Sequence, residues 1–315
     1  MTEKRSVFKL TARAVTSAAA VLTALALAIA YYNFIYLHEM PFKYFKVDCS
    51  SYDTDAKLIL KTNGIYCDFS SDGKILAAEP YKNLLVLKDK NDKTMFTADI
   101  SILHELKFSP DQKSFIAINS EVIDLNNEKV RSDCVSRRNF SNDVLSSWCV
   151  SQHLPELAGL GFSFQPSKII KKISQALPGV NENSREISHA NSIYEIPENK
   201  LSKDFPAFKK GNYLVNIFLP SYALIILDSE MKYILWSQHM NEFSAPDGIK
   251  FIASHDHQVT EDGYILSYAN DIYERPEADT FARKQNPLSK IIKWNPVTKE
   301  IQFLYDPADK GELSS

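Results

Sequence analysis

The chain has 315 residues, enough for a sizeable core, and its 44% hydrophobic and 24% charged residues are typical of a globular protein. Its formal net charge is −3 and its pI is about 6.2, which excludes the basic surface typical of nucleic-acid-binding proteins. Aromatic residues make up 11% of the chain and are mostly Tyr and Phe, which favours strands over helices.

The N-terminus carries the first recognisable signal. Residues 1–13 contain four basic side chains, and residues 14–38 form an uncharged, largely apolar run. About 20 apolar residues span a bilayer, so we predict a cytoplasmic basic tail (1–13) and a single transmembrane helix (14–38). The remainder would then lie outside the cytoplasm, in the periplasm. The alternative is a signal peptide cleaved near Ala30, which would give a secreted protein.

Residues 39–60 contain an aromatic, basic patch suited to a membrane interface, and we predict a linker there. The four cysteines fit an extracytoplasmic compartment, and their spacing matches no zinc site. Four cysteines allow three pairings. Proximity favours Cys49–Cys67 and Cys134–Cys149, and free buried thiols are the alternative.

From residue 64 the chain alternates short strands with tight turns. Phe69 and Phe108 precede SSDG and SPDQ at a separation of 39 residues, and a repeat of about 40 residues is typical of β-propeller blades. Residues 130–187 interrupt the pattern and indicate an irregular insert, within which 166–180 is either a helix or a blade strand. From Ser188 the hairpins return, including an Asp262-Gly263 turn. We predict an all-β propeller over 61–315 with about six blades, or an incomplete ring.

The histidines share one register. His104 and His255 each precede the turn aspartate of their unit by seven residues, and His189 begins the strand of another unit, with Asn191 two positions on. His257 would face the same side of its strand as His255. Because the inner strands of propeller blades line a common axis, these imidazoles would meet. They would serve as nucleophile, general acid or base, and oxyanion ligand. The alternatives are structural hydrogen bonds within each blade and a three-histidine metal site.

Residues 188–305 contain, in order, HANSIYEIPEN, GNYLV, ALIILDSEMKYILW, HDHQVTEDGYILSYAN and NPLSKIIKWNPVTKEIQFLYD. With these motifs the segment resembles the bacterial arylsulfotransferase family. This resemblance implies a periplasmic six-bladed propeller that transfers a sulfuryl group from a phenolic sulfate ester to a phenol acceptor through a sulfated histidine, with no cofactor. It identifies His255 with the nucleophile, His189 and Asn191 with sulfate ligands, and His104 with an earlier channel histidine.

The sequence departs from that family in two places. Phe218 stands where the family has an arginine that neutralises sulfate, and the family continues past the equivalent of Tyr305 into a last blade. Substitutes for the arginine would be Arg137, Arg138, Arg275 or Arg283. The alternative function is a catalytically inactive propeller that binds a ligand or a protein partner.

Overall fold

A computed structural model describes residues 48–52, 58–63, 66–79, 84–100, 102–125, 127–164, 185–219, 222–240, 253–270 and 290–305. The chain divides into two compact units, Met1–Asp48 and Cys49–Ser315. The predicted transmembrane helix lies outside the described residues. Within the described ranges, no helix is both long enough and apolar enough to cross a bilayer. Part of the predicted linker instead forms a two-stranded sheet of β1 (Asp48–Tyr52) and β2 (Leu58–Asn63).

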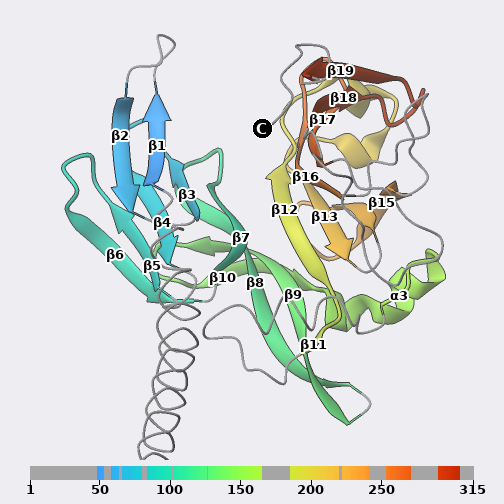
Figure 1. The fold of residues 1–315 in the computed structure, drawn as a ribbon, viewed down its shortest axis with the longest axis horizontal. Coiled ribbons are helices and arrows are strands. Elements are labelled where there is room, and N and C mark those ends of the chain that lie inside the picture. The colour runs from blue at the N-terminus through green and yellow to red at the C-terminus, as the bar shows by residue number, and fades with distance from the viewer. Residues whose placement is uncertain are drawn as a thin grey trace, which may run out of the picture. The chain divides into compact units, whose positions relative to one another are not determined.

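The first four-stranded sheet is an antiparallel meander, as the sequence predicted. It runs β3 (Tyr66–Phe69), β4 (Ile75–Glu79), β5 (Leu84–Lys88) and β6 (Thr94–Asp99) (Figure 1). Phe69 ends β3, and Phe108 ends β7, the first strand of the next sheet. The two phenylalanines of the 39-residue repeat therefore occupy equivalent places.

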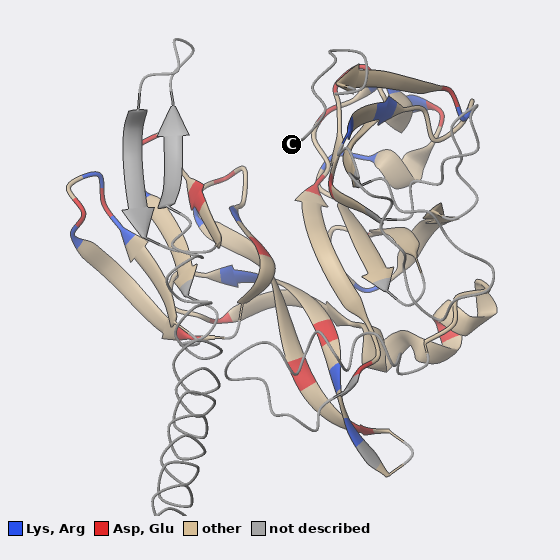
Figure 2. Ribbon diagram, viewed as in Figure 1, with Lys and Arg blue, Asp and Glu red and all other residues tan. Residues whose placement is uncertain are grey.

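The second sheet replaces the irregular insert that we predicted from residue 130. Its strands are β7 (Ile102–Phe108), β8 (Ser114–Leu125), β9 (Glu128–Asn139) and β10 (Val144–Cys149), and β11 (Arg185–Glu186) pairs in parallel with β9. Short helices follow at η3 (Val150–His153) and α3 (Leu154–Gly159). The long β8–β9 hairpin carries acidic and basic residues along its length (Figure 2).

The predicted Cys134–Cys149 disulfide is confirmed. The two cysteines lie opposite one another on β9 and β10. Cys67 is also disulfide-bonded, and the side chain of its predicted partner, Cys49, lies outside those the structure describes. Residues 166–180, which were left as helix or strand, lie outside the described residues as well.

The third and fourth sheets repeat the meander. The third runs β12 (His189–Glu195), β13 (Tyr213–Leu219), β14 (Ala223–Leu227) and β15 (Ile234–His239), with η4 (Lys200–Lys203) and η5 (Pro206–Phe208) between its first two strands. The fourth runs β16 (Ala253–Val259), β17 (Ile265–Asn270), β18 (Lys290–Trp294) and β19 (Ile301–Tyr305). At the predicted β16–β17 turn, Gly263 has φ +87° and lies against Leu201, so the turn requires a glycine.

The sheets pack face to face in chain order. Every residue of β14 is buried, and its side chains alternate between two cores. Ile225 and Leu227 join the core shared with the second sheet, whereas Leu224 and Ile226 join the core shared with the fourth. Each such side chain contributes roughly 1.5–3 kcal/mol of burial free energy. A third core lies between the first two sheets.

This packing brings the first strands of successive sheets together. β3 contacts β7, β7 contacts β12, and β12 contacts β16. Blades of a propeller are arranged in this way, with each first strand innermost. The all-β, blade-like architecture is thus present as four antiparallel sheets among the described residues, and the ring of about six blades stays a prediction.

Candidate functional site

The first strands are irregular at the predicted histidines. The pairing register shifts between Ile102 and Leu106 in β7, on both sides of Ala190 in β12, and between His255 and Gln258 in β16. His104 has φ +62° and Asp256 has φ +53°, a left-handed conformation that is uncommon for residues other than glycine. Bulges of this kind re-aim side chains and occur frequently beside active sites. Three bulged strands therefore surround one place in the fold.

Four aromatic rings connect these strands. The ring centroids of His104 and His189 are 4.5 Å apart in an edge-on contact. Phe218 from β13 lies 6.1 Å from His189 and 5.6 Å from His255. The structure thus brings the three predicted histidines into one group, which we call the histidine cluster (His104, His189, His255), with Phe218 between two of its members.

The shared register holds for two of the three histidines. In the hairpin of each of these two histidines, one backbone amide donates the hydrogen bond that closes the turn: Ser109 in the second sheet and Thr260 in the fourth. His104 lies five residues before Ser109, and His255 lies five residues before Thr260. The corresponding bond in the third sheet is made by Ile196, and five residues before it stands Asn191. His189 joins the cluster from two residues further back, because β12 contains two register shifts.

Burial lowers the pKa of all three imidazoles. For His104 the pKa falls to about 3, since burial is reinforced by the charges of His189, His255 and Arg131. For His255, burial and His189 lower the pKa although Asp256 raises it. For His189, burial outweighs the opposing effect of Asp133. At neutral pH the cluster is therefore uncharged, and neutral imidazoles are the form that acts as nucleophile or general base.

Asn191 and His257 have protein partners of their own. Asn191 donates to the carbonyl of Ser254 (3.2 Å) and accepts from Asn216 (2.6 Å), which also donates to Ser254 (2.9 Å). This amide pair ties β12 and β13 to β16. Asn216 was not predicted, because its role depends on two distant strands.

His257 does not share the surroundings of His255. Because the β16 bulge separates the two residues, strict alternation does not hold between them. The His257 side chain is 1% exposed, with Nε2 3.1 Å from the Ser254 hydroxyl and Nδ1 3.5 Å from the Ser192 hydroxyl. Burial lowers its pKa to about 3. This geometry is that of a histidine that joins two strands.

Behind His189 lies a buried group of charges, the Arg131 network (Arg131, Asp133, Glu186, His189). Nδ1 of His189 is 3.1 Å from Glu186, which is ion-paired with Arg131. The sequence analysis proposed other arginines. Of these, Arg137 pairs with Asp111 and Arg138 bonds to Asn142, while Arg275 and Arg283 lie outside the described residues. Arg131 was missed because its contacts depend on pairing between β9 and β11, which are distant in sequence.

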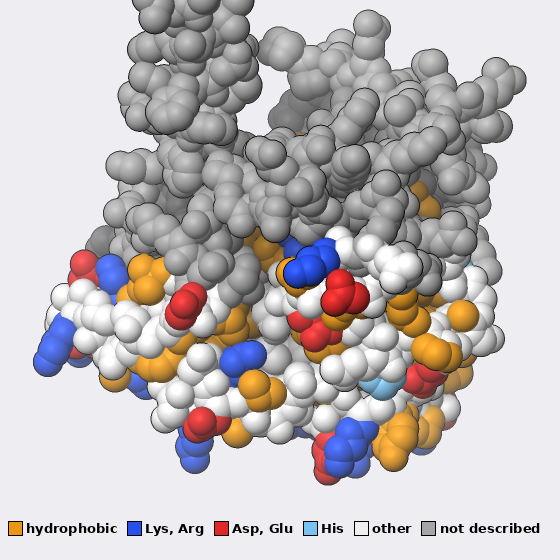
Figure 3. Space-filling view, turned by 90° about the horizontal axis from the view of Figure 1, so that it is seen from below, with side chains coloured by type: hydrophobic (Ala, Val, Ile, Leu, Met, Phe, Trp, Pro, Cys, Tyr) orange, Lys and Arg blue, Asp and Glu red, His pale blue; other side chains and the backbone are white. Residues whose placement is uncertain are grey.

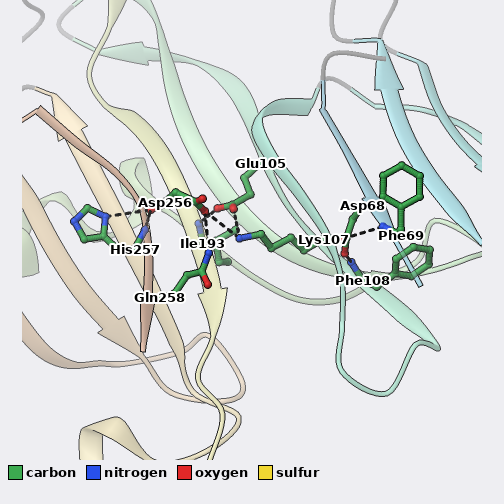
Figure 4. A network of polar contacts seen from close by, with 10 residues as sticks. Asp68, Phe69, Glu105, Lys107, Phe108, Ile193, Asp256, His257 and Gln258 are labelled. Atoms are coloured by element: carbon green, nitrogen blue, oxygen red, sulfur yellow. Dashed lines mark hydrogen bonds and ion pairs between the residues drawn. The ribbon is translucent and has the colours of Figure 1, made fainter. Parts of the chain in front are cut away.

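A second charged group, the Lys107 network (Glu105, Lys107, Asp256), bridges β7 and β16 (Figure 4). Lys107 is ion-paired with Glu105 and lies 3.3 Å from Asp256. Glu105 also accepts a hydrogen bond from the Ile193 amide of β12. Burial raises the pKa of Glu105 to about 7 against the lowering effect of Lys107. Glu105 and Asp256 follow His104 and His255 directly, so both networks adjoin the histidine cluster.

The other described histidines lie elsewhere. His153 stacks on Trp148 and pairs with Glu156 at 2.9 Å, and His239 packs against Phe162. His38 lies outside the described residues. Among described residues, the group spaced closely enough to hold a metal is Glu121 with Cys134 and Cys149, whose thiols are joined in a disulfide. On the face in Figure 3, acidic and basic side chains are interspersed with apolar ones.

Comparisons with known proteins give one family. A family model described as Arylsulfotransferase (ASST) matches residues 80–313. No curated protein matches the chain. Similar solved structures include Kuenenia stuttgartiensis hydrazine synthase (9% identity, TM-score 0.41, covering 82% of this chain and 59% of that one) and a protein of unknown function from Bacteroides caccae (12%, 0.37, 79% and 80%). The chain thus spans about three fifths of the hydrazine synthase chain.

Proposed function

Because the chain belongs to the arylsulfotransferase family, we propose that it transfers a sulfuryl group between phenolic compounds through a sulfated histidine. The observation that carries this proposal is the histidine cluster. Its three uncharged imidazoles come from three successive sheets and are connected by ring contacts, directly or through Phe218. Sulfuryl transfer needs an uncharged nitrogen nucleophile and polar groups around the sulfuryl oxygens. The cluster supplies both kinds of group.

His255 is the proposed nucleophile, since it is the least buried of the three. Its nitrogen attacks the sulfur of a phenolic sulfate ester; the S–N bond forms, the S–O bond to the aryl group breaks, and the electron pair leaves with the phenolate. A second phenol then attacks the same sulfur. The S–N bond breaks and its electron pair returns to His255. His104 and His189 lie beside the sulfuryl group.

Phe218 supports an aromatic substrate. It lies between His189 and His255, and a third ring, Tyr222, is 6.0 Å from it. A phenyl ring packs well against such rings. In this proposal the aryl group lies against Phe218, next to His189 and His255.

The test is an assay of the full-length chain in detergent with 4-nitrophenyl sulfate as donor and phenol as acceptor. We expect nitrophenol release that disappears in His255→Ala and persists in His153→Gln, a matched histidine outside the cluster. Mass spectrometry of the donor-treated protein should find one added sulfuryl group on the peptide containing His255. A folded wild-type chain without release would overturn the proposal in favour of a ligand-binding propeller.

We also propose that the chain is anchored by residues 14–38 with its β domain in the periplasm. The basic tail and apolar run support this orientation, and the Cys134–Cys149 disulfide supports an oxidising compartment. Protease added to intact spheroplasts should digest the β domain. Protection of that domain until the membrane is dissolved would contradict the assignment.

A further inference from the structure

One member of the histidine cluster, His189, has a ring nitrogen in contact with a buried carboxylate. Nδ1 of His189 lies 3.1 Å from a carboxylate oxygen of Glu186, and the other oxygen of Glu186 is ion-paired with Arg131. The side chains of Glu186 and Arg131 are 1% and 9% exposed. Glu186 and Arg131 are also direct register partners in the parallel β11–β9 pair. The His189 imidazole, the Glu186 carboxylate and the Arg131 guanidinium therefore form one chain of contacts, and its Glu186 and Arg131 side chains are buried.

Hydrogen bonds to β9 also fix the backbone on both sides of His189. The Ile187 amide donates to the carbonyl of Arg131 (2.9 Å), and the Ala190 amide donates to the Asp133 carboxylate (2.6 Å). Between them, Ser188 exchanges two hydrogen bonds with Asp133: its hydroxyl accepts from the amide (3.0 Å) and donates to the carboxylate (3.2 Å). Residues on both sides of His189 are thus bound to β9, which fixes the main chain from which the ring projects.

We propose that Glu186, supported by Arg131, is a positioning residue that fixes His189 as the Nδ1–H tautomer and so presents Nε2 as a proton acceptor to the substrates. This inference rests on the proposed sulfuryl transfer for its chemistry, although the tautomer itself does not. A carboxylate can only accept, so the nitrogen facing Glu186 must carry the proton. The other ring nitrogen is then left with its lone pair. Histidines held by a carboxylate in this way are fixed in both tautomer and orientation.

The proton step follows from that tautomer. When the acceptor phenol attacks the sulfuryl group on His255, the phenolic O–H proton passes to Nε2 of His189. The new S–O bond forms as the S–N bond breaks, and the electron pair returns to His255. His189 then releases this proton to solvent, and the phenolate that leaves in the next donor half-reaction takes up a proton from solvent. His189 is therefore restored once per cycle, and no external acid or base is consumed.

The charges around His189 suit a transient imidazolium. Glu186 faces it from β11, Asp133 and Arg131 from β9, His104 from β7 and His255 from β16. Burial raises the pKa of Asp133, whereas Arg131 and the hydrogen bonds from Ala190 and Ser188 favour its ionised form. The buried carboxylates thus stabilise the protonated intermediate during the transfer, while burial keeps the resting imidazole neutral.

The deciding measurement is nitrogen NMR of the full-length chain in detergent with ¹⁵N-labelled histidine. The His189 signals are assigned from their absence in His189→Gln. We expect a protonated Nδ1 and an unprotonated Nε2 in the wild type. A protonated Nε2 would overturn the proposal. In Glu186→Gln the tautomer should become mixed or reversed, whereas in Glu156→Gln, which alters the exposed pair at His153, the His189 signals should not move.

The sulfuryl-transfer assay is then carried out with the same two variants, Glu186→Gln and Glu156→Gln. Glu186→Gln should lower kcat roughly 10–100-fold, with KM little changed and with an altered pH dependence of kcat, whereas Glu156→Gln should match the wild type. Unchanged kinetics and an unchanged His189 tautomer in a folded Glu186→Gln chain would overturn the positioning role. A wild-type chain that shows the predicted tautomer but no sulfuryl transfer would overturn the proposed function and leave the Glu186–His189 assignment standing.

Discussion

Two buried groups of charges lie beside the histidine cluster, and they differ in how far water can reach them. In the Arg131 network, the Glu186 side chain is 1% exposed and the Asp133 residue 3%. In the Lys107 network, the Asp256 side chain is 56% exposed while Glu105 is 10%. We call the first network closed because its two carboxylates are almost completely buried, and the second open because one end of it lies in solvent.

That difference determines what each network can do. In a closed network no charge can lose its partner cheaply, because neither water nor a nearby proton donor replaces it. The Arg131 network therefore suits the holding of one geometry around His189. In the Lys107 network a proton can enter from solvent, and the pKa of Glu105, raised by burial to about 7, lies in the range where that happens. The second network is therefore titratable.

The largest loss of stability should follow from removing the cation of the Arg131 network. Arg131→Met leaves Glu186 and Asp133 buried without their cation, and breaking a buried pair in this way costs about 3–5 kcal/mol. The free energy of unfolding in urea measures the loss. Lys232→Met is the control, since Lys232 pairs with Glu230 at the surface and such exposed pairs contribute little to stability. Equal losses in the two variants would remove the distinction between closed and open networks.

A smaller loss is expected when the cation of the open network is removed. Lys107→Met leaves Glu105 without its partner, but Glu105 keeps the hydrogen bond from the Ile193 amide and can bind a proton. Asp256 remains in contact with water. We therefore expect a cost of about 1–3 kcal/mol, measured by the same urea titrations. A loss as large as that of Arg131→Met would show that the Lys107 network is closed as well.

The third prediction concerns pH. Because the folded pKa of Glu105 lies above its ordinary value, the folded state binds more protons than the unfolded state between about pH 4.5 and 7. The stability from this group is full below that range and is lost as the pH rises through it. Relative to Glu105→Gln, the wild type should lose about 2–3 kcal/mol between about pH 5 and pH 8. Lys107, Asp256 and Tyr194 face this group and stay the same in the comparison.

A flat difference between those two pH profiles would contradict the titration of Glu105. The comparison must be made against the variant, because His104 and His257 act in the opposite direction. Their depressed pKa values, both about 3, make the fold less stable as the pH falls below about 6.5. These contributions are common to wild type and Glu105→Gln, so they cancel in the difference.

The two networks also show what the sequence could and could not predict. The hairpin turns and the 39-residue repeat are local patterns, and they correctly predicted the blade-like sheets. The Cys134–Cys149 pair was correctly predicted from the short separation of the two cysteines in the sequence. The grouping of His104, His189 and His255 followed from applying propeller geometry to that repeat. Residues 128–149 were not predicted as a regular hairpin, because the polar SRRNFSND turn and the cysteines resemble a loop.

The parts that were missed depend on contacts between distant segments. Glu186 and Arg131 are 55 residues apart, and no local pattern in either segment marks the parallel β9–β11 pairing that joins them. Similarly, the position of His257 could not be predicted from strand alternation, because a bulge between His255 and Gln258 breaks it. Bulges and long-range strand pairs are set by tertiary packing, which a single sequence pattern does not contain.

The smallest effect should come from the exposed counterpart of the His189–Glu186 pair. His153 and Glu156 have the same three-residue separation and nearly the same contact, 2.9 Å, but the Glu156 side chain is 43% exposed. Because water replaces the lost partner, Glu156→Gln should change the free energy of unfolding by less than about 0.5 kcal/mol, and added salt should reduce the change further. Glu186→Gln, measured beside it, should cost several times more and respond little to salt. If the two glutamates gave equal losses, burial would not be what distinguishes the pair at the histidine cluster, and the spacing alone would explain both.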